Sequence, residues 1–231
     1  MKKIVAIALC LGIMGCSAAP DVEEVASVSQ AVHSWNGYHW ARTSSDPLRI
    51  ELVDAVTPAW KPFLAEASVD WTASSVIDSP IVPTTAKGCK ATIGKVTVCN
   101  GKYGRNGWLG IAQVWLSTPG HIVQGLVKLN DTYFSMAQYS SPALKRLVTC
   151  QEVGHTYGLD HQDEDFNNAN LGTCMDYAAN PEGPPSNEHP NAHDYEELEE
   201  IYSHVESAQA SSTTTGNSAM LTHEFPAFHG R

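Results

Sequence analysis

The sequence predicts an α+β domain in which helices pack on a single sheet. Residues 48–54 alternate apolar and polar side chains, as in a half-buried strand. Further strand-like segments lie at residues 76–82, 111–116 and 121–129. Because the later segments lie between two helical segments, we expect them to share one sheet.

Three helices are expected along the chain. The first covers residues 58–71, with Thr57 as its cap and a proline at its first position. The second begins after the cap Ser141 and continues through residues 142–157, with apolar side chains at helical spacing on one face. The third is an amphipathic helix over residues 192–205.

The charge of the chain excludes one class of partner. Its 231 residues include 14 Lys and Arg against 25 Asp and Glu, a net charge of −11, and no basic run. Nucleic-acid phosphates and anionic lipid headgroups repel such a chain, so we expect no nucleic-acid partner. The length suits one domain of ordinary size, and we expect a monomer.

The N-terminus predicts export and a lipid anchor. An apolar run, residues 4–14, follows two lysines and is shorter than the roughly 20 residues that a membrane-spanning helix needs. The run ends in Ile13-Met14-Gly15-Cys16, which resembles a bacterial lipobox. Residues 1–15 are then a lipoprotein signal peptide, and Cys16 carries the lipid. Cleavage at the small residues 17–19 is the alternative.

These features predict a secreted protein of the bacterial cell envelope, at the outer membrane if the source is Gram-negative. Contact with the membrane is expected through the lipid anchor only. Residues 16–34 are small and acidic, and form either a tether or a short pro-segment. Residues 35–206 form the domain, and residues 207–231 are a Ser/Thr-rich tail.

Because the protein is expected to be exported, its remaining cysteines are expected to form disulfides. One of the six lies in the removed segment and Cys16 is lipidated, so four remain in an oxidising compartment, where three pairings are possible. Cys89 and Cys99 flank a short β-rich stretch around a glycine that could fold as a hairpin, so we pair these two. By subtraction, Cys150 pairs with Cys174.

An eleven-residue segment carries the candidate chemistry: Gln-Glu-Val-Gly-His-Thr-Tyr-Gly-Leu-Asp-His, beginning at Gln151. On a helix, Gln151 and His155 share a face, so both can reach one ion. Glu152 is rotated by about 100° and lies beside the ion instead. Gly158 allows a sharp turn that brings His161 round as a third ligand.

This segment resembles the metzincin zinc-peptidase signature, His-Glu-x-x-His-x-x-Gly-x-x-His, with Gln151 in place of the first histidine. Gln-Glu-x-x-His versions occur in the gametolysin branch. Thr-Cys-Met-Asp-Tyr at residues 173–177 resembles the metzincin Met-turn, in which Met175 would form a hydrophobic base under the metal. Tyr177 matches the astacin-like and serralysin-like branches.

The resemblance implies a zincin-like fold over residues 48–205. Such a fold has a twisted mixed sheet and two helices above a cleft, with a small lower lobe that holds one C-terminal helix. A substrate would pair with an edge strand at residues 109–116, and residues 178–190 would wall the pocket for the residue after the scissile bond.

The resemblance also implies roles for individual residues. His155 and His161 would ligate the metal, and Glu152 would act as the general base. Tyr177 would donate a hydrogen bond to the oxyanion, or is an ordinary packing tyrosine. Gln151 would be a weaker ligand than imidazole, so a divalent ion other than Zn²⁺ stands as an alternative. A Cys150–Cys174 disulfide would tie the helix to the Met-turn.

Two other groups of polar residues are not expected to bind the catalytic metal. The acidic segment 163–168 could ligate calcium but lacks EF-hand spacing, which favours a solvated loop. His189, His193 and Asp194 near the start of the last helix are interpreted as capping and surface groups rather than as a replacement ligand for Gln151.

The sequence therefore predicts a lipid-anchored metalloendopeptidase that hydrolyses peptides or proteins. The alternative is a catalytically inactive relative with the same fold, which binds a metal or a peptide at the cell surface.

Overall fold

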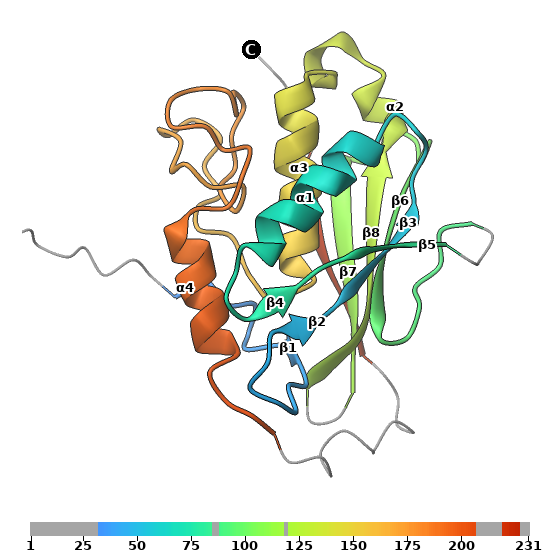
Figure 1. Ribbon diagram of the computed structural model, residues 1–231. Helices are drawn as coiled ribbons and strands as arrows, with labels where there is room; N and C mark the ends of the chain where they lie inside the picture. The colour runs from blue at the N-terminus through green and yellow to red at the C-terminus, as the bar shows by residue number, and fades with distance from the viewer. Residues whose placement is uncertain (1–31, 85–87, 118–119, 207–218, 227–231) are drawn as a thin grey trace, which may run out of the picture. The chain divides into compact units, whose positions relative to one another are not determined.

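The computed structural model describes residues 32–84, 88–117, 120–206 and 219–226 (Figure 1). The chain divides into two units, residues 1–30 and 31–231. The predicted signal peptide, Cys16 and nearly all of the acidic segment 16–34 lie outside the described residues. No helix of the described part combines the length and the apolar character that crossing a bilayer requires.

The second unit is an α+β structure built on a mixed sheet, as predicted. The order of its strands is β5-β3-β6-β8-β7-β9, and β1 pairs with the start of β8. The strands are β1 (His39–Trp40), β3 (Glu51–Ala55), β5 (Ile81–Pro83), β6 (Lys95–Gly101), β7 (Trp108–Leu116), β8 (His121–Asn130) and β9 (Ala219–Pro226). The pairs β7/β8 and β7/β9 are antiparallel and the others are parallel. A separate parallel pair joins β2 (Leu48–Arg49) to β4 (Ile77–Asp78).

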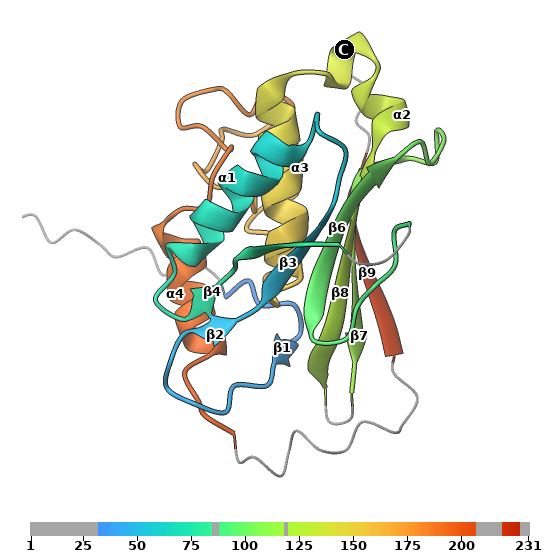
Figure 2. The ribbon, with the colours of Figure 1, turned by 45° about the vertical axis from the view of Figure 1, so that its right-hand side comes forward.

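Two long helices pack against one face of this sheet. The helices α1 (Lys61–Thr72) and α3 (Pro142–His155) lie side by side across it (Figure 2). Trp71 of α1 is fully buried, and its indole N–H donates to the carbonyl of Cys150 in α3 (3.0 Å). The short helices α2 (Asp131–Phe134) and η1 (Ala137–Tyr139) precede α3, and α4 (Ala192–Ile201) follows the long loop. This packing fixes α3 between α1 and the sheet.

The predicted helix boundaries are partly wrong. The cap Ser141 is confirmed, because its Oγ accepts the N–H of Leu144 (3.1 Å). Thr57 does not cap α1: its carbonyl closes a turn with Trp60, and the helix begins only at Lys61. The last helix ends at Ile201 rather than at residue 205, and the carbonyl of its C-cap residue Tyr202 accepts a hydrogen bond from Arg42 (2.6 Å).

The expected strands also divide differently. The predicted strands 48–54 and 76–82 are each split in two, giving β2 and β3, and β4 and β5. The expected hairpin between Cys89 and Cys99 is wrong. A turn at residues 92–95 leads into the single strand β6, which pairs with β3 and β8 instead. The disulfide Cys89–Cys99 forms nevertheless, with its Cα atoms 5.7 Å apart.

The C-terminal strand β9 has no counterpart in the sequence prediction. The predicted domain ends at residue 206, whereas the structure adds residues 219–226 to the sheet along the whole of β7. Residues 109–116 are therefore not an edge strand. The side chains of β9 alternate, with Leu221, His223 and Phe225 facing inward and Phe225 fully buried. Burial of this face explains why so short a segment joins the sheet.

Gly158 shapes the chain directly after α3. Its φ is +97°, and a Cβ at this position would lie 2.1 Å from the carbonyl oxygen of Tyr38. The backbone therefore needs glycine both for its conformation and for this close approach.

We expect Gly158→Ala to destabilise the protein by more than about 3 kcal/mol, because strain and a backbone clash add together. Gly104→Ala is the matched control: its φ is +89°, but nothing lies within 4 Å of the added carbon. It should cost about 1–2 kcal/mol through strain alone. Denaturant unfolding of both variants tests this, and equal losses would contradict the clash.

Candidate metal centre

The C-terminal half of α3 carries polar side chains into the core. Gln151, Glu152 and His155 are all fully buried. Gly154 allows this close packing, since a Cβ there would lie 2.6 Å from the Trp71 ring and 2.8 Å from the sulfur of Met175. Burial of three polar groups on one helix requires a partner for each of them.

His155 and His161 are brought together by the turn at the end of α3. Their ring centroids lie 4.6 Å apart. Nδ1 of His155 is 2.9 Å from the carbonyl oxygen of Leu159, and Nδ1 of His161 is 2.9 Å from Oε1 of Glu164. Because both partners are acceptors, Nδ1 carries the proton in each ring and Nε2 keeps its lone pair. This tautomer suits metal ligation.

A third histidine, His223, completes the group. It comes from β9, and one ligand atom from each of His155, His161 and His223 lies within 4.8 Å of the others. Its ring stacks on His155 with centroids 4.3 Å apart. His223 is not among the ligands that the sequence predicts. The alternation of Leu221, His223 and Phe225 is the signal that could have indicated an inward-facing histidine.

The electrostatics of this three-histidine group favour neutral rings. Burial lowers the pKa of His155 well below its ordinary value, and the two neighbouring imidazoles act in the same direction. Burial likewise lowers the pKa of His161 to about 3, and it lowers the pKa of His223. The Nε2 atoms of all three are buried without a hydrogen-bond partner in the described part of the chain, and that of His223 lies 3.5 Å from Oδ1 of Asp160. Three neutral imidazoles whose Nε2 atoms make no hydrogen bond fit a divalent metal of the zinc type.

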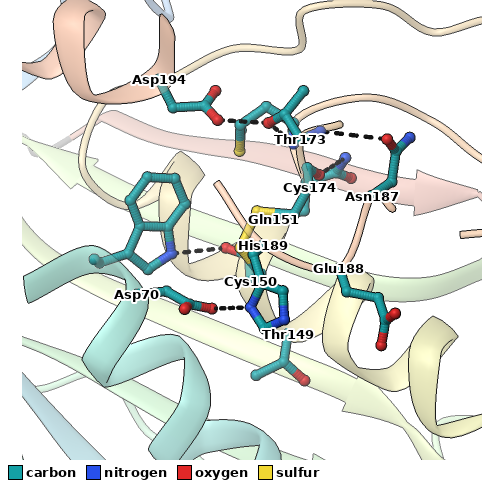
Figure 3. The surroundings of a disulfide bond; sticks show 12 residues. Asp70, Thr149, Cys150, Gln151, Thr173, Cys174, Asn187, Glu188, His189 and Asp194 are labelled. Atoms are coloured by element: carbon teal, nitrogen blue, oxygen red, sulfur yellow. Dashed lines mark hydrogen bonds and ion pairs between the residues drawn. A yellow bond between two sulfur atoms is a disulfide. The ribbon is translucent and has the colours of Figure 1, made fainter. Parts of the chain in front are cut away.

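Gln151 is oriented by the Met-turn. Its Nε2 donates to the carbonyl of Cys174 (2.7 Å), and Figure 3 shows the amide beside the disulfide that joins this turn to α3. Its Oε1 is buried and has no hydrogen-bond partner among the described residues. The free atom of Gln151 is therefore the oxygen, which is the atom that a metal would require.

Glu152 faces the sheet and β9. Its Oε1 accepts the backbone N–H of Phe225 (3.1 Å), while Oε2 is buried without a partner in the ranges described. Gly110 of β7 leaves room for this carboxyl, since a Cβ there would lie 2.6 Å from Oε1. Burial raises the pKa of Glu152 well above its usual value, although the nearby backbone N–H groups of Phe225 and Ala112 oppose the shift.

Tyr177 lies between the histidines and β9. Its hydroxyl donates to the carbonyl oxygen of Glu224 (3.1 Å), and its ring centroid lies 4.5 Å from that of His161. The ring also packs on Phe166 and Phe225. Burial raises the pKa of the Tyr177 hydroxyl, with Glu152 adding to the effect, so the group stays a proton donor at neutral pH.

One peptide group of β9 is thus held at both ends. Tyr177 donates to the carbonyl of Glu224, and Glu152 accepts the N–H of the next residue, Phe225. The Phe225 side chain is fully buried, with Phe166 5.7 Å away between ring centroids. The two predicted catalytic side chains therefore contact the same peptide bond from opposite sides.

The turn at residues 173–177, which resembles a Met-turn, is held by its neighbours. The disulfide Cys150–Cys174 joins it to α3, with Cα atoms 6.0 Å apart, so both predicted pairs are present. Met175 is fully buried, and its carbonyl accepts the N–H of Gln162 (2.7 Å). The turn and the segment after His161 therefore support each other.

The remaining predicted groups make contacts within the protein. Asp194 belongs to the capping box of α4, as predicted, but it is fully buried and also accepts the hydroxyl of Thr173 (2.5 Å; Figure 3). His193 stacks on His33 with ring centroids 4.7 Å apart, and His189 lies at the surface, 2.9 Å from Asp70 (Figure 3). In the acidic segment, Asp163 and Asp165 accept backbone N–H groups of their own loop (2.6 and 2.9 Å). The loop 178–190 contacts the Met-turn through Asn187, whose side chain donates to Asp176 (2.7 Å).

Comparison with known proteins adds no assignment: no family model matches the chain, and no curated protein matches it either. The interpretation of the site therefore depends on its geometry.

Only one of the two disulfides joins the candidate metal site. Two double variants test its role: Cys150→Ser/Cys174→Ser and Cys89→Ser/Cys99→Ser. The bonds close 24- and 10-residue separations, so each loss should cost about 3 kcal/mol. Only loss of Cys150–Cys174 should also weaken metal binding, because only this bond holds the turn that orients Gln151. Metal titration and denaturant unfolding of both variants test this. Equal metal affinities would show that the Met-turn does not depend on the disulfide.

Proposed function

We propose that the chain is a metal-dependent endopeptidase that takes an extended peptide antiparallel to β7. The observation that carries the proposal is the Glu224–Phe225 peptide group. It lies with its carbonyl on Tyr177 and its N–H on Glu152, beside three histidines with free Nε2 atoms. The resemblance of residues 151–161 and 173–177 to metzincin motifs agrees with this assignment, and a zincin-like arrangement is part of the proposal.

The ligands would be His155 and His161, joined by His223 while β9 is in place. The oxygen of Gln151 would be a weaker ligand from the same face of α3 as His155. A bound zinc ion supplies Lewis acidity, which lowers the pKa of water towards about 7 and polarises a carbonyl group. Imidazole nitrogens favour zinc, and the amide oxygen leaves other divalent ions as alternatives.

The chain's own residues would perform the remaining steps. Glu152 accepts a proton from the attacking water and delivers it to the leaving nitrogen, the atom type that Phe225 places against its Oε1. Tyr177 donates a hydrogen bond to the carbonyl oxygen as negative charge develops there. The backbone of β7 aligns the peptide through antiparallel pairing.

The site also suggests which peptides fit. Phe225 follows the peptide bond that Glu152 and Tyr177 contact, and it is fully buried against Phe166 and Tyr177. A substrate would therefore carry a large aromatic or apolar side chain directly after the scissile bond.

In the described structure, β9 occupies the position proposed for the substrate. An external peptide must displace β9, and with it His223, before it pairs with β7. In this proposal the chain in this form is a latent enzyme whose own C-terminal strand occupies the place of the substrate on β7. We also propose that the lipid anchor at Cys16 holds a monomeric enzyme at the cell envelope.

The rival proposal is a catalytically silent protein that binds a metal or a peptide. Gln151 in place of a histidine favours it, because an amide oxygen binds zinc more weakly than imidazole. Measurement of metal content and of peptide cleavage on the same preparation separates the two proposals.

We expect Glu152→Gln to reduce peptide cleavage by at least about 100-fold, because it removes the proton acceptor. Metal affinity should be unchanged, since Glu152 is not a ligand. Glu200→Gln, at an exposed position of α4, is the matched control and should keep full activity. The measurement is the rate at which a peptide library is cleaved at bonds that precede a large apolar residue. Activity that survives Glu152→Gln would refute the assigned role.

His223→Ala should change metal binding and activity in opposite directions. Metal affinity should fall by about tenfold or more because a ligand is lost, while cleavage should rise because β9 no longer binds the metal. Thr222→Ala, whose side chain is exposed on the same strand, should leave both unchanged. A chelator competition titration and a fluorogenic peptide assay give the two readouts. If both quantities fall together, His223 is a catalytic ligand and β9 is not inhibitory.

A further inference from the structure

We propose a second metal site, separate from the first, formed by His39, His121, His204 and Glu206. These residues come from three parts of the chain: β1, the first residue of β8, and the segment after α4. The ligand would be a divalent ion that prefers imidazole and carboxylate, for which Zn²⁺ is the probe. The proposal does not depend on peptidase activity.

The four side chains converge on one point. The Nε2 atoms of His39, His121 and His204 lie 3.0, 3.0 and 3.2 Å from the same oxygen, Oε1 of Glu206. One carboxylate oxygen offers about two lone pairs, so three imidazoles exceed what it can accept as hydrogen bonds. The other oxygen, Oε2, accepts the backbone N–H of Arg42 (2.9 Å), which leaves Oε1 aimed at the histidines.

The tautomer of His39 also indicates a ligand. Its Nδ1 lies 2.7 Å from the carbonyl oxygen of Gly37. A carbonyl only accepts, so Nδ1 carries the proton and Nε2 of the neutral ring has a lone pair. That lone pair faces the carboxylate oxygen of Glu206, which is another acceptor. A cation between them, either a metal ion or a second proton on the ring, satisfies both acceptors, and a backbone carbonyl on Nδ1 is the usual support for a metal-ligating histidine.

The distances agree with zinc coordination. Zinc bonds to nitrogen and oxygen of about 2.0–2.1 Å in a tetrahedron separate the ligand atoms by about 3.3 Å. The three nitrogen–oxygen distances around Glu206 are within a few tenths of an ångström of that value. Ligand atoms of His39, His121 and Glu206 all lie within 4.8 Å of one another. His204 does not belong to that group of three, so its exposed ring would have to move toward His39 and His121 to become the fourth ligand.

The surroundings suit a structural ion that exchanges slowly. The side chains of His39, His121 and Glu206 are 17, 11 and 11 % exposed, and that of His204 is 51 % exposed. The ion would enter from the side of His204. With four protein ligands the site is closed, as in structural rather than catalytic zinc sites. It would clamp β1 and β8 to the segment that follows α4.

The test is zinc binding by the metal-free full chain, measured by native mass spectrometry and thermal unfolding. His155→Ala/His161→Ala, which removes ligands of the first site, should still bind one zinc and gain thermal stability from it. Adding His121→Ala to that variant should abolish both effects. Adding His189→Ala instead, a surface histidine paired with Asp70, should change neither.

A second variant keeps the test valid if His121→Ala fails to fold. His204 is half exposed, so His204→Ala in the same background should fold and still weaken zinc binding by about tenfold or more. Cobalt substitution should give the absorption bands of a tetrahedral site, which the His204 variant should lose. If the His155/His161 variant binds no zinc and its unfolding temperature does not change when zinc is added, the four residues of the proposed site form only a histidine–carboxylate hydrogen-bond network. The proposal is then wrong, whatever the first site does.

Discussion

The buried carboxyl group of Glu152 is the constraint on which the surrounding structure depends. A carboxyl without partners in the core costs several kcal/mol, so the fold must provide them. One comes from the backbone N–H of Phe225, which only β9 can bring there. Room for the group comes from Gly110, which lies opposite Phe225 in the pairing of β7 with β9. The helix α3, the strand β7 and the C-terminal strand are therefore interdependent.

The buried polar side chains of α3 share one pattern. In Gln151 and His155, one atom is held by a backbone carbonyl, from Cys174 and Leu159 respectively. The other polar atom of each is left free and buried. Backbone groups that hold one end of a side chain fix the direction of the other end at little entropic cost. Such orientation before binding is what a metal site needs from its supporting residues.

Local signals predicted the parts of the site that lie close together in the chain. Helical spacing placed Glu152 and His155, and the glycine at 158 predicted the turn that brings His161 back. The cap Ser141 follows from the same local rules. His223 could not be found in this way, because its position depends on pairing between strands more than 100 residues apart. The hairpin expected between Cys89 and Cys99 fails for the same reason, since β6 finds its partners in β3 and β8.

The contact between β9 and Glu152 is made by the backbone of Phe225, and Tyr177 likewise binds a backbone carbonyl. Neither contact depends on the identity of a side chain, so another extended peptide could take the place of β9 on β7. Exchange would then be a competition between a tethered strand and a free one. A strand on the same chain acts at an effective concentration of about millimolar when its linker is short. In the proposed enzyme, only peptides that are abundant, or that bind more tightly than β9, would displace the strand.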